Sequence, residues 1–224
     1  MIDTSLISTG FLAGASEDLK SLLVEVGKET KLNTGDQLME QGTKGESLYV
    51  VLSGALEVSV LSMDGRRLAL NVMHPGDILG EIALFDPGPH TATVTARQAS
   101  HVWGIKNSDV MAALQRSPGL GADLMRLAGQ RMRWMGRQLN EQVFLPLPAR
   151  LARKILHLTD HDTATQPKLA LSQLELADFA GASREAVSKA LSGWNSSGLI
   201  ALSRGAVTVL DKDALKKIAE MSFF

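Results

Sequence analysis

Apolar and polar residues alternate along residues 31–105, and this period of two constrains the fold more than any other feature of the chain. Three short runs show it: Leu48–Leu52, Leu56–Val60 and Leu68–Val72. Alternation places every second side chain on one face of a β-strand. Glycines punctuate the runs at short spacing, at positions 35, 42, 45, 54, 65, 76 and 80. Short strands with closely spaced turns predict an antiparallel β-roll of the jelly-roll or barrel type.

The turn between the second and third runs is Asp64-Gly65, a strong hairpin signal because both positions tolerate positive φ. Helical patterns flank the β-region, near Glu17–Lys28 before it and near Ser108–Arg116 after it. We therefore expect an α+β fold in which residues 1–117 form an N-terminal domain around the β-roll.

A long helical pattern follows Pro118 and reaches about Leu145. A neighbouring stripe of larger apolar residues contains Met125, Met132, Met135 and Leu139. The helix therefore has two apolar sides. It is either a buried helix of its own domain or, as we expect, the dimerisation helix of a twofold homodimer. The predicted dimer seam recurs at alternating three- and four-residue steps, as in a coiled coil: Leu120, Leu124, Leu127, Arg131, Trp134 and Gln138.

Pro146 and Pro148 interrupt the helix, since proline removes a backbone donor and clashes with the preceding turn. We place a hinge there. The predicted domains are residues 1–117, a dimerisation helix over 118–145, and a C-terminal domain over 146–224. The C-terminal domain begins with a helix over Ala149–Leu158, and the polar stretch Thr159–Lys168 is predicted to be a loop.

Two short helical patterns flank Gly181 within residues 172–200. Ser172 and Glu175 form a capping box, in which each side chain accepts from the other residue's backbone N–H. Gly181 lies where the turn needs a residue without a Cβ. Ser183 is able to cap the second helix, which covers residues 183–197.

The second helix of this pair divides into two flanks when its residues are placed at about 100° intervals. The apolar flank contains Ala186, Val187, Ala190, Leu191 and Trp194, and we expect it to pack inward. A helix-turn-helix reads DNA with such a polar flank. The residues that we expect to contact DNA are Ser183, Arg184, Glu185, Ser188 and Lys189.

The alternative is an ordinary amphipathic helix pair with a solvated charged face. The sequence after Gly198 favours DNA reading, because Leu199–Leu210 has the pattern of two strands around an Arg204-Gly205 turn. That hairpin is the expected wing, and Arg204 at its tip is the expected phosphate contact.

The distribution of charge along the chain is compatible with nucleic-acid binding by its C-terminal part. The net charge is −1, but residues 1–144 carry 13 Lys and Arg against 16 Asp and Glu, whereas residues 145–224 carry 10 against 8. The small basic excess therefore lies with the predicted DNA reader. The chain has no cysteine, which excludes disulfides and cysteine-ligated zinc or iron–sulfur clusters. No signal peptide or membrane span is evident, and we expect a cytoplasmic protein.

The order of β-roll, long helix, proline hinge and winged helix-turn-helix resembles the CRP/FNR superfamily of bacterial transcription regulators. Three stretches carry the resemblance. Gly80–Phe85 is similar to the phosphate-binding cassette of cyclic-nucleotide domains, Phe144–Ala152 to the hinge and the helix after it, and Gly181–Lys189 to the turn and recognition helix. The resemblance implies a dimeric DNA-binding regulator that works with RNA polymerase and is not an enzyme.

The DNA-reading residues match two branches of this family. In the catabolite-activator branch an Arg-Glu pair opens the recognition helix and a basic residue follows, as do Arg184, Glu185 and Lys189 here. In the oxygen-regulator branch the trio is Glu, Ser and Arg, which Glu185, Ser188 and Lys189 also fit. Arg or Lys donates to guanine, and a carboxylate accepts from cytosine. The resemblance therefore implies a palindromic operator whose half-sites contain a TGA-like core.

The effector pocket matches the family less closely. The cyclic-AMP sensors place an Arg-Ser pair on the cyclic phosphate and a Thr-Ser pair over the adenine, where this chain has His90-Thr91 and Met135-Gly136. Our hypothesis is a pocket that binds cyclic AMP weakly and takes another nucleotide, a small anion or nothing. The residues that the resemblance assigns to it are Gly80, Glu81, Ile82, Ala83, His90 and Thr91.

Two other classes of function compete with this one. A metal-dependent β-roll enzyme needs clustered histidines, but those of this chain, at 74, 90, 101, 157 and 161, are scattered. His157 and His161 are spaced as a metal face on a helix, yet they more simply end a helix and begin a loop. The third class is a ligand-binding module without sequence-specific DNA binding. The winged helix-turn-helix argues against both, so no catalytic or metal-binding residue is predicted.

Overall fold

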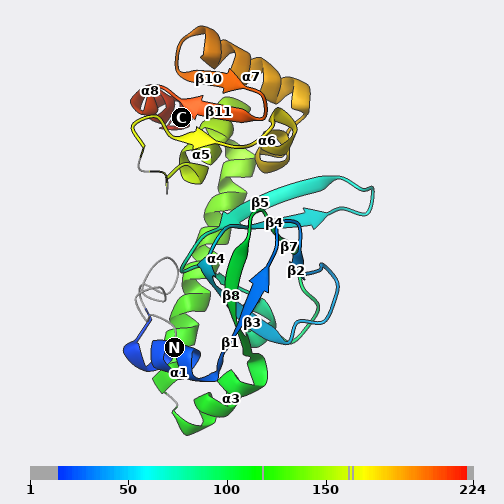
Figure 1. Cartoon of the computed structure of the whole chain (residues 1–224), viewed down its shortest axis with the longest axis vertical. Coiled ribbons are helices and arrows are strands. Elements are labelled where there is room, and N and C mark those ends of the chain that lie inside the picture. The colour runs from blue at the N-terminus through cyan, green and yellow to red at the C-terminus, as the bar shows by residue number, and fades with distance from the viewer. Residues whose placement is uncertain (1–14, 118, 161, 163, 221–224) are drawn as a thin grey trace. The chain divides into compact units, whose positions relative to one another are not determined.

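The computed structural model describes residues 15–117, 119–160, 162 and 164–220 (Figure 1). The chain forms two compact units that divide between residues 133 and 134. The long helix α4 (Gly119–Phe144) begins in the first unit and ends in the second. The division thus falls within the predicted dimerisation helix, whereas the sequence suggested a hinge at Pro146. None of the described helices is both long and apolar enough to cross a bilayer.

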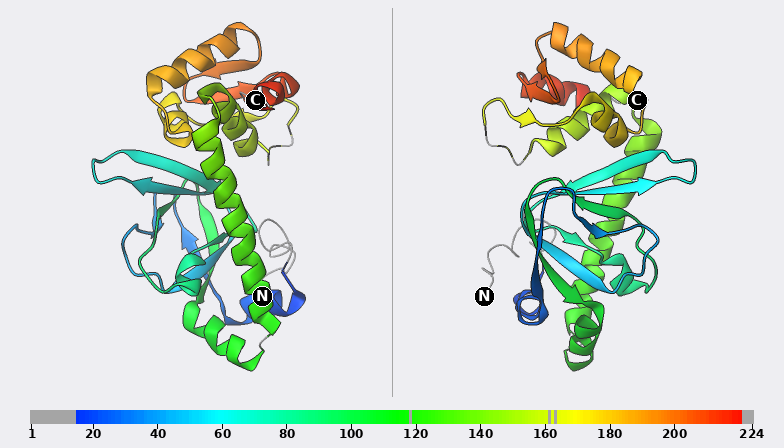
Figure 2. Two further views of the ribbon diagram at one scale, coloured as in Figure 1. Left: turned by 180° about the vertical axis from the view of Figure 1, so that it is seen from behind. Right: turned by 45° about the vertical axis from the view of Figure 1, so that its right-hand side comes forward.

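Two four-stranded antiparallel sheets form the β-roll of the first unit, as the alternating pattern predicted (Figure 2). One sheet has the order β1-β8-β3-β6, formed by Lys28–Leu32, Ser100–Lys106, Ser47–Ser53 and Ile78–Leu79. The other has the order β2-β7-β4-β5, formed by Gln37–Met39, Thr93–Ala96, Leu56–Leu61 and Arg67–Met73.

Strand β3 differs from the simple alternation that the sequence suggested. Val50 and Val51 are both fully buried, and each belongs to a different hydrophobic cluster. One cluster lies between strands of the two sheets, and the other includes α1, α3 and the start of α4. The sheet containing β3 is therefore covered on both faces. The predicted hairpin turn is confirmed, with Gly65 at φ +81° between β4 and β5.

Three helices complete the first unit: α1 (Glu17–Val26), α2 (Ile82–Phe85) and α3 (Asn107–Arg116). The start of α4 packs into the same core, where Leu120, Leu124 and Leu127 are buried. Side chains buried within one chain offer no surface to a second copy. Their assignment to a dimer seam is therefore wrong, because they close the core of their own unit.

Within the part of the chain that the structure describes, the second unit contains four helices in addition to the end of α4, and a small sheet of order β10-β11-β9. The predicted pair of wing strands is confirmed, whereas β9 and α8 were not predicted. Its elements are α5 (Leu147–Leu158), β9 (Lys168–Leu169), α6 (Gln173–Ala180), α7 (Arg184–Ser196), β10 (Ile200–Ser203), β11 (Ala206–Val209) and α8 (Lys212–Glu220).

Helix α1 is fixed to α4 by a charged contact. Ser16 caps α1 by accepting from the backbone N–H of Leu19, and its hydroxyl also donates to the carboxylate of Asp123. Arg126 bonds to the same carboxylate from α4. The Ser16 hydroxyl, with a smaller contribution from Arg126, lowers the pKa of Asp123 although burial opposes the shift. The folded state thus favours the ionised carboxylate.

We predict that Asp123→Asn lowers the free energy of unfolding by about 1–3 kcal/mol at neutral pH, because it removes a bond to a charged acceptor. A pKa that is lowered in the folded state stabilises the fold above the ordinary carboxyl value of about 3.9 and loses that effect as the pH falls. The difference between wild type and variant should therefore shrink on acidification, measured by denaturant unfolding at several pH values. Asp86→Asn, at an exposed loop carboxylate, is the control.

Candidate functional site

The turn between α6 and α7 is built as the sequence predicted. Ser172 accepts from the backbone of Glu175 at 3.2 Å, and the Glu175 carboxylate accepts from the backbone of Ser172 at 2.8 Å. Gly181 ends α6 in the left-handed conformation, with φ +59° and ψ +45°. Ser183 then caps α7 through the backbone N–H of Ala186 at 3.2 Å. Local sequence therefore fixes both helix ends and the turn between them.

Helix α7 keeps its charged flank exposed and packs its apolar flank inward. Val187 and Leu191 are fully buried in the second unit. Ser188 is half-buried on the boundary between the flanks. The exposed side chains of the polar flank include Arg184, Glu185 and Lys189. The structure thus brings the predicted DNA-contact residues of the helix onto one accessible surface.

Glu185 is well suited to accept a hydrogen bond. Its own backbone N–H, the Ser183 hydroxyl and the nearby charge of Arg184 lower the pKa of the Glu185 carboxyl. A lowered pKa keeps the group ionised at neutral pH. An ionised carboxylate at the start of a recognition helix accepts from the N4 amino group of cytosine.

The wing lies beside α7, as Figure 2 shows. Arg204 is exposed at the turn between β10 and β11, where Gly205 has φ +71°. The backbone N–H of Leu202 donates to Asn195 Oδ1 of α7 at 3.1 Å, which ties the wing strand to the helix. A groove of about 490 Å³ separates the wing from the start of α6. Of its lining residues, the sequence predicted Arg184 as a DNA contact but gave no sign of Gln173, Leu174 or Ser203.

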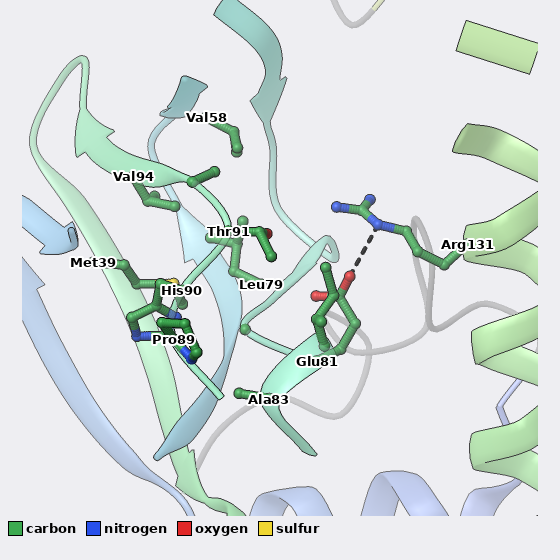
Figure 3. A pocket seen from close by; sticks show the side chains of 13 residues that line it. Met39, Val58, Leu79, Glu81, Ala83, Pro89, His90, Thr91, Val94 and Arg131 are labelled. Atoms are coloured by element: carbon green, nitrogen blue, oxygen red, sulfur yellow. Dashed lines mark ion pairs between the residues drawn. The ribbon is translucent and has the colours of Figure 1, made fainter. Parts of the chain in front are cut away.

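The six residues assigned to the effector site all line one pocket of the first unit (Figure 3). Its volume is about 50 Å³, enough for a few water molecules. Gly80 has φ +79°, and a Cβ there would lie 2.5 Å from the carbonyl oxygen of Ser47. Only glycine fits this position without strain. The helix that follows, α2, is a single turn and too short to provide an anion site at its N-terminus. Binding of a ligand in the pocket would therefore depend chiefly on the side chains that line it.

Arg131 reaches into the same pocket from α4, opposite Glu81 (Figure 3). Its Nε lies 2.9 Å from Glu81 Oε1, and both side chains are largely buried. Sequence reasoning placed Arg131 in the dimer seam and did not foresee that its guanidinium lines the pocket. Its spacing from Leu124 and Leu127 could have indicated the inward direction, because all three lie on one side of α4.

The backbone of His90 anchors the loop on the other side of the pocket. Its N–H donates to Thr43 at 2.7 Å, and its carbonyl accepts from Gly42 at 2.9 Å. The imidazole lies close to Gly45, where an added Cβ would be 3.1 Å from its Cε1 atom. Thr91 is exposed and presents its hydroxyl beside the pocket.

Of the two remaining seam residues, Gln138 bonds within its own unit, whereas the seam assignment of Trp134 stays a prediction. Trp134 is half-buried, and Gln138 accepts from Lys154 of α5 at 2.9 Å. The exposed apolar residues of α4 are instead those of the neighbouring stripe. They are Met125, Met132, Met135 and Leu139, followed by Val143 and Phe144.

No group of three or more histidine, cysteine, aspartate or glutamate side chains able to hold a metal ion occurs among the described residues. His161, part of the metal face considered from the sequence, lies outside the described residues. His74 precedes a turn in which Asp77 accepts from its backbone N–H at 2.9 Å.

A β-roll with a charged pocket and a winged helix-turn-helix with an exposed reading flank together define a regulator that combines a sensor-type domain with a DNA-reading domain. Comparison with known families agrees. Residues 29–117 match the family model of the cyclic nucleotide-binding domain, and residues 149–218 match that of the Crp-like helix-turn-helix domain.

Whole-chain relatives share this organisation. The chain is 28% identical over 223 residues to the CRP-like cAMP-activated global transcriptional regulator of Mycobacterium tuberculosis, which covers 97% of this chain and 100% of the relative. It is 30% identical over 162 residues to the cAMP-activated global transcriptional regulator CRP of Salmonella typhimurium, with 69% of this chain and 76% of the relative covered. A CRP-family transcriptional regulator from Thermus thermophilus superposes with a TM-score of 0.72 at 27% identity, over 87% of this chain and 98% of that one.

The chain belongs to the CRP/FNR family of transcription regulators. It is a DNA-binding regulator and not an enzyme, as the sequence indicated.

Proposed function

We propose that this regulator acts as a homodimer on a palindromic operator with TGA-like half-sites, and that a small anionic effector in the β-roll pocket controls it. The exposed charged flank of α7 is the observation that carries the proposal. Arg184 and Lys189 are the donors for guanine, Glu185 is the acceptor for cytosine, and Ser183 and Ser188 contact the backbone or base edges. Arg204 of the wing contacts a phosphate.

The exposed stripe of α4 supports the dimer. Met125, Met132 and Leu139 recur every seven residues, and the last two are 68% and 64% exposed. A heptad repeat of exposed apolar residues on a long helix is the pattern that a parallel helix pair buries. Two recognition helices related by a twofold axis would enter successive major grooves, spaced roughly 34–36 Å apart.

The pocket supports an anionic effector because the Arg131 guanidinium is held inside it. Glu81 forms an ion pair with this guanidinium. A ligand phosphate or carboxylate would replace Glu81 at Arg131, and the Thr91 hydroxyl would add a hydrogen bond. The named relatives respond to cyclic AMP. We infer that a cyclic nucleotide binds this pocket only weakly, because His90 lacks the planar fork and permanent charge of arginine and because a pocket of about 50 Å³ must open to admit it.

We also infer that the protein works in the cytoplasm and contacts RNA polymerase, since an operator-bound regulator acts on transcription there. Its functional parts are an effector domain over 1–117, a dimerisation helix over 118–145 and a DNA-binding domain over 146–224.

Selection from random duplexes should return half-sites with G·C-dependent preferences, which tests DNA reading directly. Arg184→Ala or Glu185→Ala should weaken binding to the selected operator by about 1–3 kcal/mol and relax the preference at one base pair. Quantitative gel shifts with single-base operator variants measure both effects. Arg116→Ala removes an exposed cation from α3 in the first unit and should change neither. Equal loss on every duplex would contradict base reading.

Met132→Glu should dissociate the dimer, because it places a charge from each copy within the apolar stripe that the two copies are proposed to bury. Sedimentation equilibrium measures the shift from dimer to monomer. Met63→Glu is the matched control, since Met63 is fully exposed at the β4–β5 turn outside the stripe. A wild type that sediments as a monomer would refute the dimer.

His90→Arg should strengthen cyclic AMP binding by about tenfold or more, since it supplies a fixed charge and a forked donor for the phosphate. Isothermal titration calorimetry compares it with the wild type, for which we expect no submicromolar affinity. The double variant His90→Arg/Thr91→Ala should lose part of the gain. Submicromolar binding by the wild type would show that His90 is no obstacle.

A further inference from the structure

The end of α4 and the start of α5 form an antiparallel helical hairpin within the second unit. Three basic side chains of α5 bond across this hairpin. As the residue number rises along α5, that of the α4 partner falls, which is the register of antiparallel helices. The three bonds are Lys154 Nζ to Gln138 Oε1 at 2.9 Å, Arg153 Nη1 to Glu141 Oε1 at 3.1 Å and Arg150 Nη1 to the Gln142 carbonyl at 2.8 Å.

We call these six residues the hairpin lock. On α5 they are spaced i, i+3 and i+4, at positions 150, 153 and 154, and on α4 they have the same spacing at 138, 141 and 142. Residues with this spacing lie on one face of a helix. On each helix the three positions therefore share one face, and the lock joins these two faces through three hydrogen bonds, one of them to a backbone carbonyl.

The lock combines a partly exposed ion pair, Arg153–Glu141, whose side chains are 38% and 24% exposed, with one buried cation. Lys154 is 9% exposed, and burial lowers the pKa of its ammonium although the Glu141 carboxylate opposes the shift. A buried cation is tolerated only when it is hydrogen-bonded, so separating it from Gln138 is costly. Arg153 also donates from Nε to the carbonyl of Ala219 at 2.7 Å, which adds α8 to the same contact.

Helix α5 connects the lock to the helices of the DNA-binding unit. Its opposite face, which includes Leu151 and Ile155, is fully buried, and α5 packs against α6, α7 and α8. At about 100° per residue, the centre of the exposed stripe Met135, Leu139 and Val143 lies roughly a quarter turn from the lock face. A second copy can therefore dock on the stripe without displacing the lock.

We propose that the hairpin lock fixes the recognition helix relative to the twofold axis and thereby sets the half-site spacing that the protein accepts. This inference rests on the proposed dimer and operator. The lock residues are positioning residues: they contact neither bases nor the second copy, and they act by holding α5 to the segment of α4 that carries the stripe. Without the lock, each reading unit could still bind a half-site but would no longer be held at one separation.

The test compares two operators obtained by selection with the full-length protein, one with the preferred spacing and one with two base pairs inserted between the half-sites. Wild type should bind the second about tenfold or more weakly, because the inserted pairs rotate and displace one half-site. The variant Gln138→Ala/Glu141→Ala removes two acceptors from α4 and leaves every reading residue intact. It should lower that ratio to about threefold or less, with unchanged affinity for a single half-site.

Asn140→Ala is the matched control, since Asn140 is exposed in the same turn of α4 but outside both the lock and the stripe. A charge-reversal series separates positioning from instability. Glu141→Lys should lose spacing discrimination, and Glu141→Lys/Arg153→Glu should recover it, with folding checked by thermal melts of each protein.

A variant with the wild-type ratio, or one that loses half-site and full-operator binding equally, would overturn the inference. A wild type that is monomeric or shows no preference for paired half-sites would instead refute the proposed function, and the inference with it. Sedimentation and single-half-site binding distinguish these two failures.

Discussion

The burial of one side of α4 is the constraint on which the rest of the structure depends. Leu120, Leu124 and Leu127 close the core of the first unit together with α1 and α3. Because that side of the helix must face inward, Arg131, one turn further along the same side, points into the β-roll pocket and meets Glu81. The packing that stabilises the domain thus also delivers the main cationic group of its pocket.

The remaining faces of α4 make different contacts along the length of the helix. A stripe of exposed methionines and Leu139 runs along one face. Beyond residue 134 another face bonds to α5, so this last part of the helix belongs to the DNA-reading unit. One continuous helix therefore carries a pocket residue, an apolar stripe and the support of the recognition helix.

Features set by local sequence were predictable. The Asp64-Gly65 hairpin, the capping box at Ser172 and the left-handed Gly181 each depend on a few neighbouring residues, and the structure contains all of them. The period of two predicted the strands, but burial along β3 and β4 does not alternate strictly. The charged and apolar flanks of α7 follow from helical geometry alone. The pocket residues were found through family resemblance, and the structure brings all six together.

Features that depend on residues distant in the sequence could not be predicted. A spacing of three and four residues identifies an inward helix face, but a domain core and a second copy require the same spacing. Leu120, Leu124 and Leu127 were therefore assigned to the wrong partner, and the place of Arg131 in the pocket was missed. Strand β9 has only two residues, too few to produce a pattern, and its pairing with β11 is a tertiary contact. The hydrogen bonds of the lock between α4 and α5 could not be predicted for the same reason. Polar residues on a helix are expected to face solvent, and the sequence does not show that those of α4 and α5 face each other.

Gly80 limits how this pocket can change over evolutionary time. Its backbone has φ +79°, and the carbonyl of Ser47 occupies the space that a Cβ would need. A side chain at this position would displace the backbone that forms the wall of the pocket. The side chains around it, among them His90, Thr91 and Arg131, set the charge and the size of the cavity, whereas Gly80 holds the backbone that forms its wall.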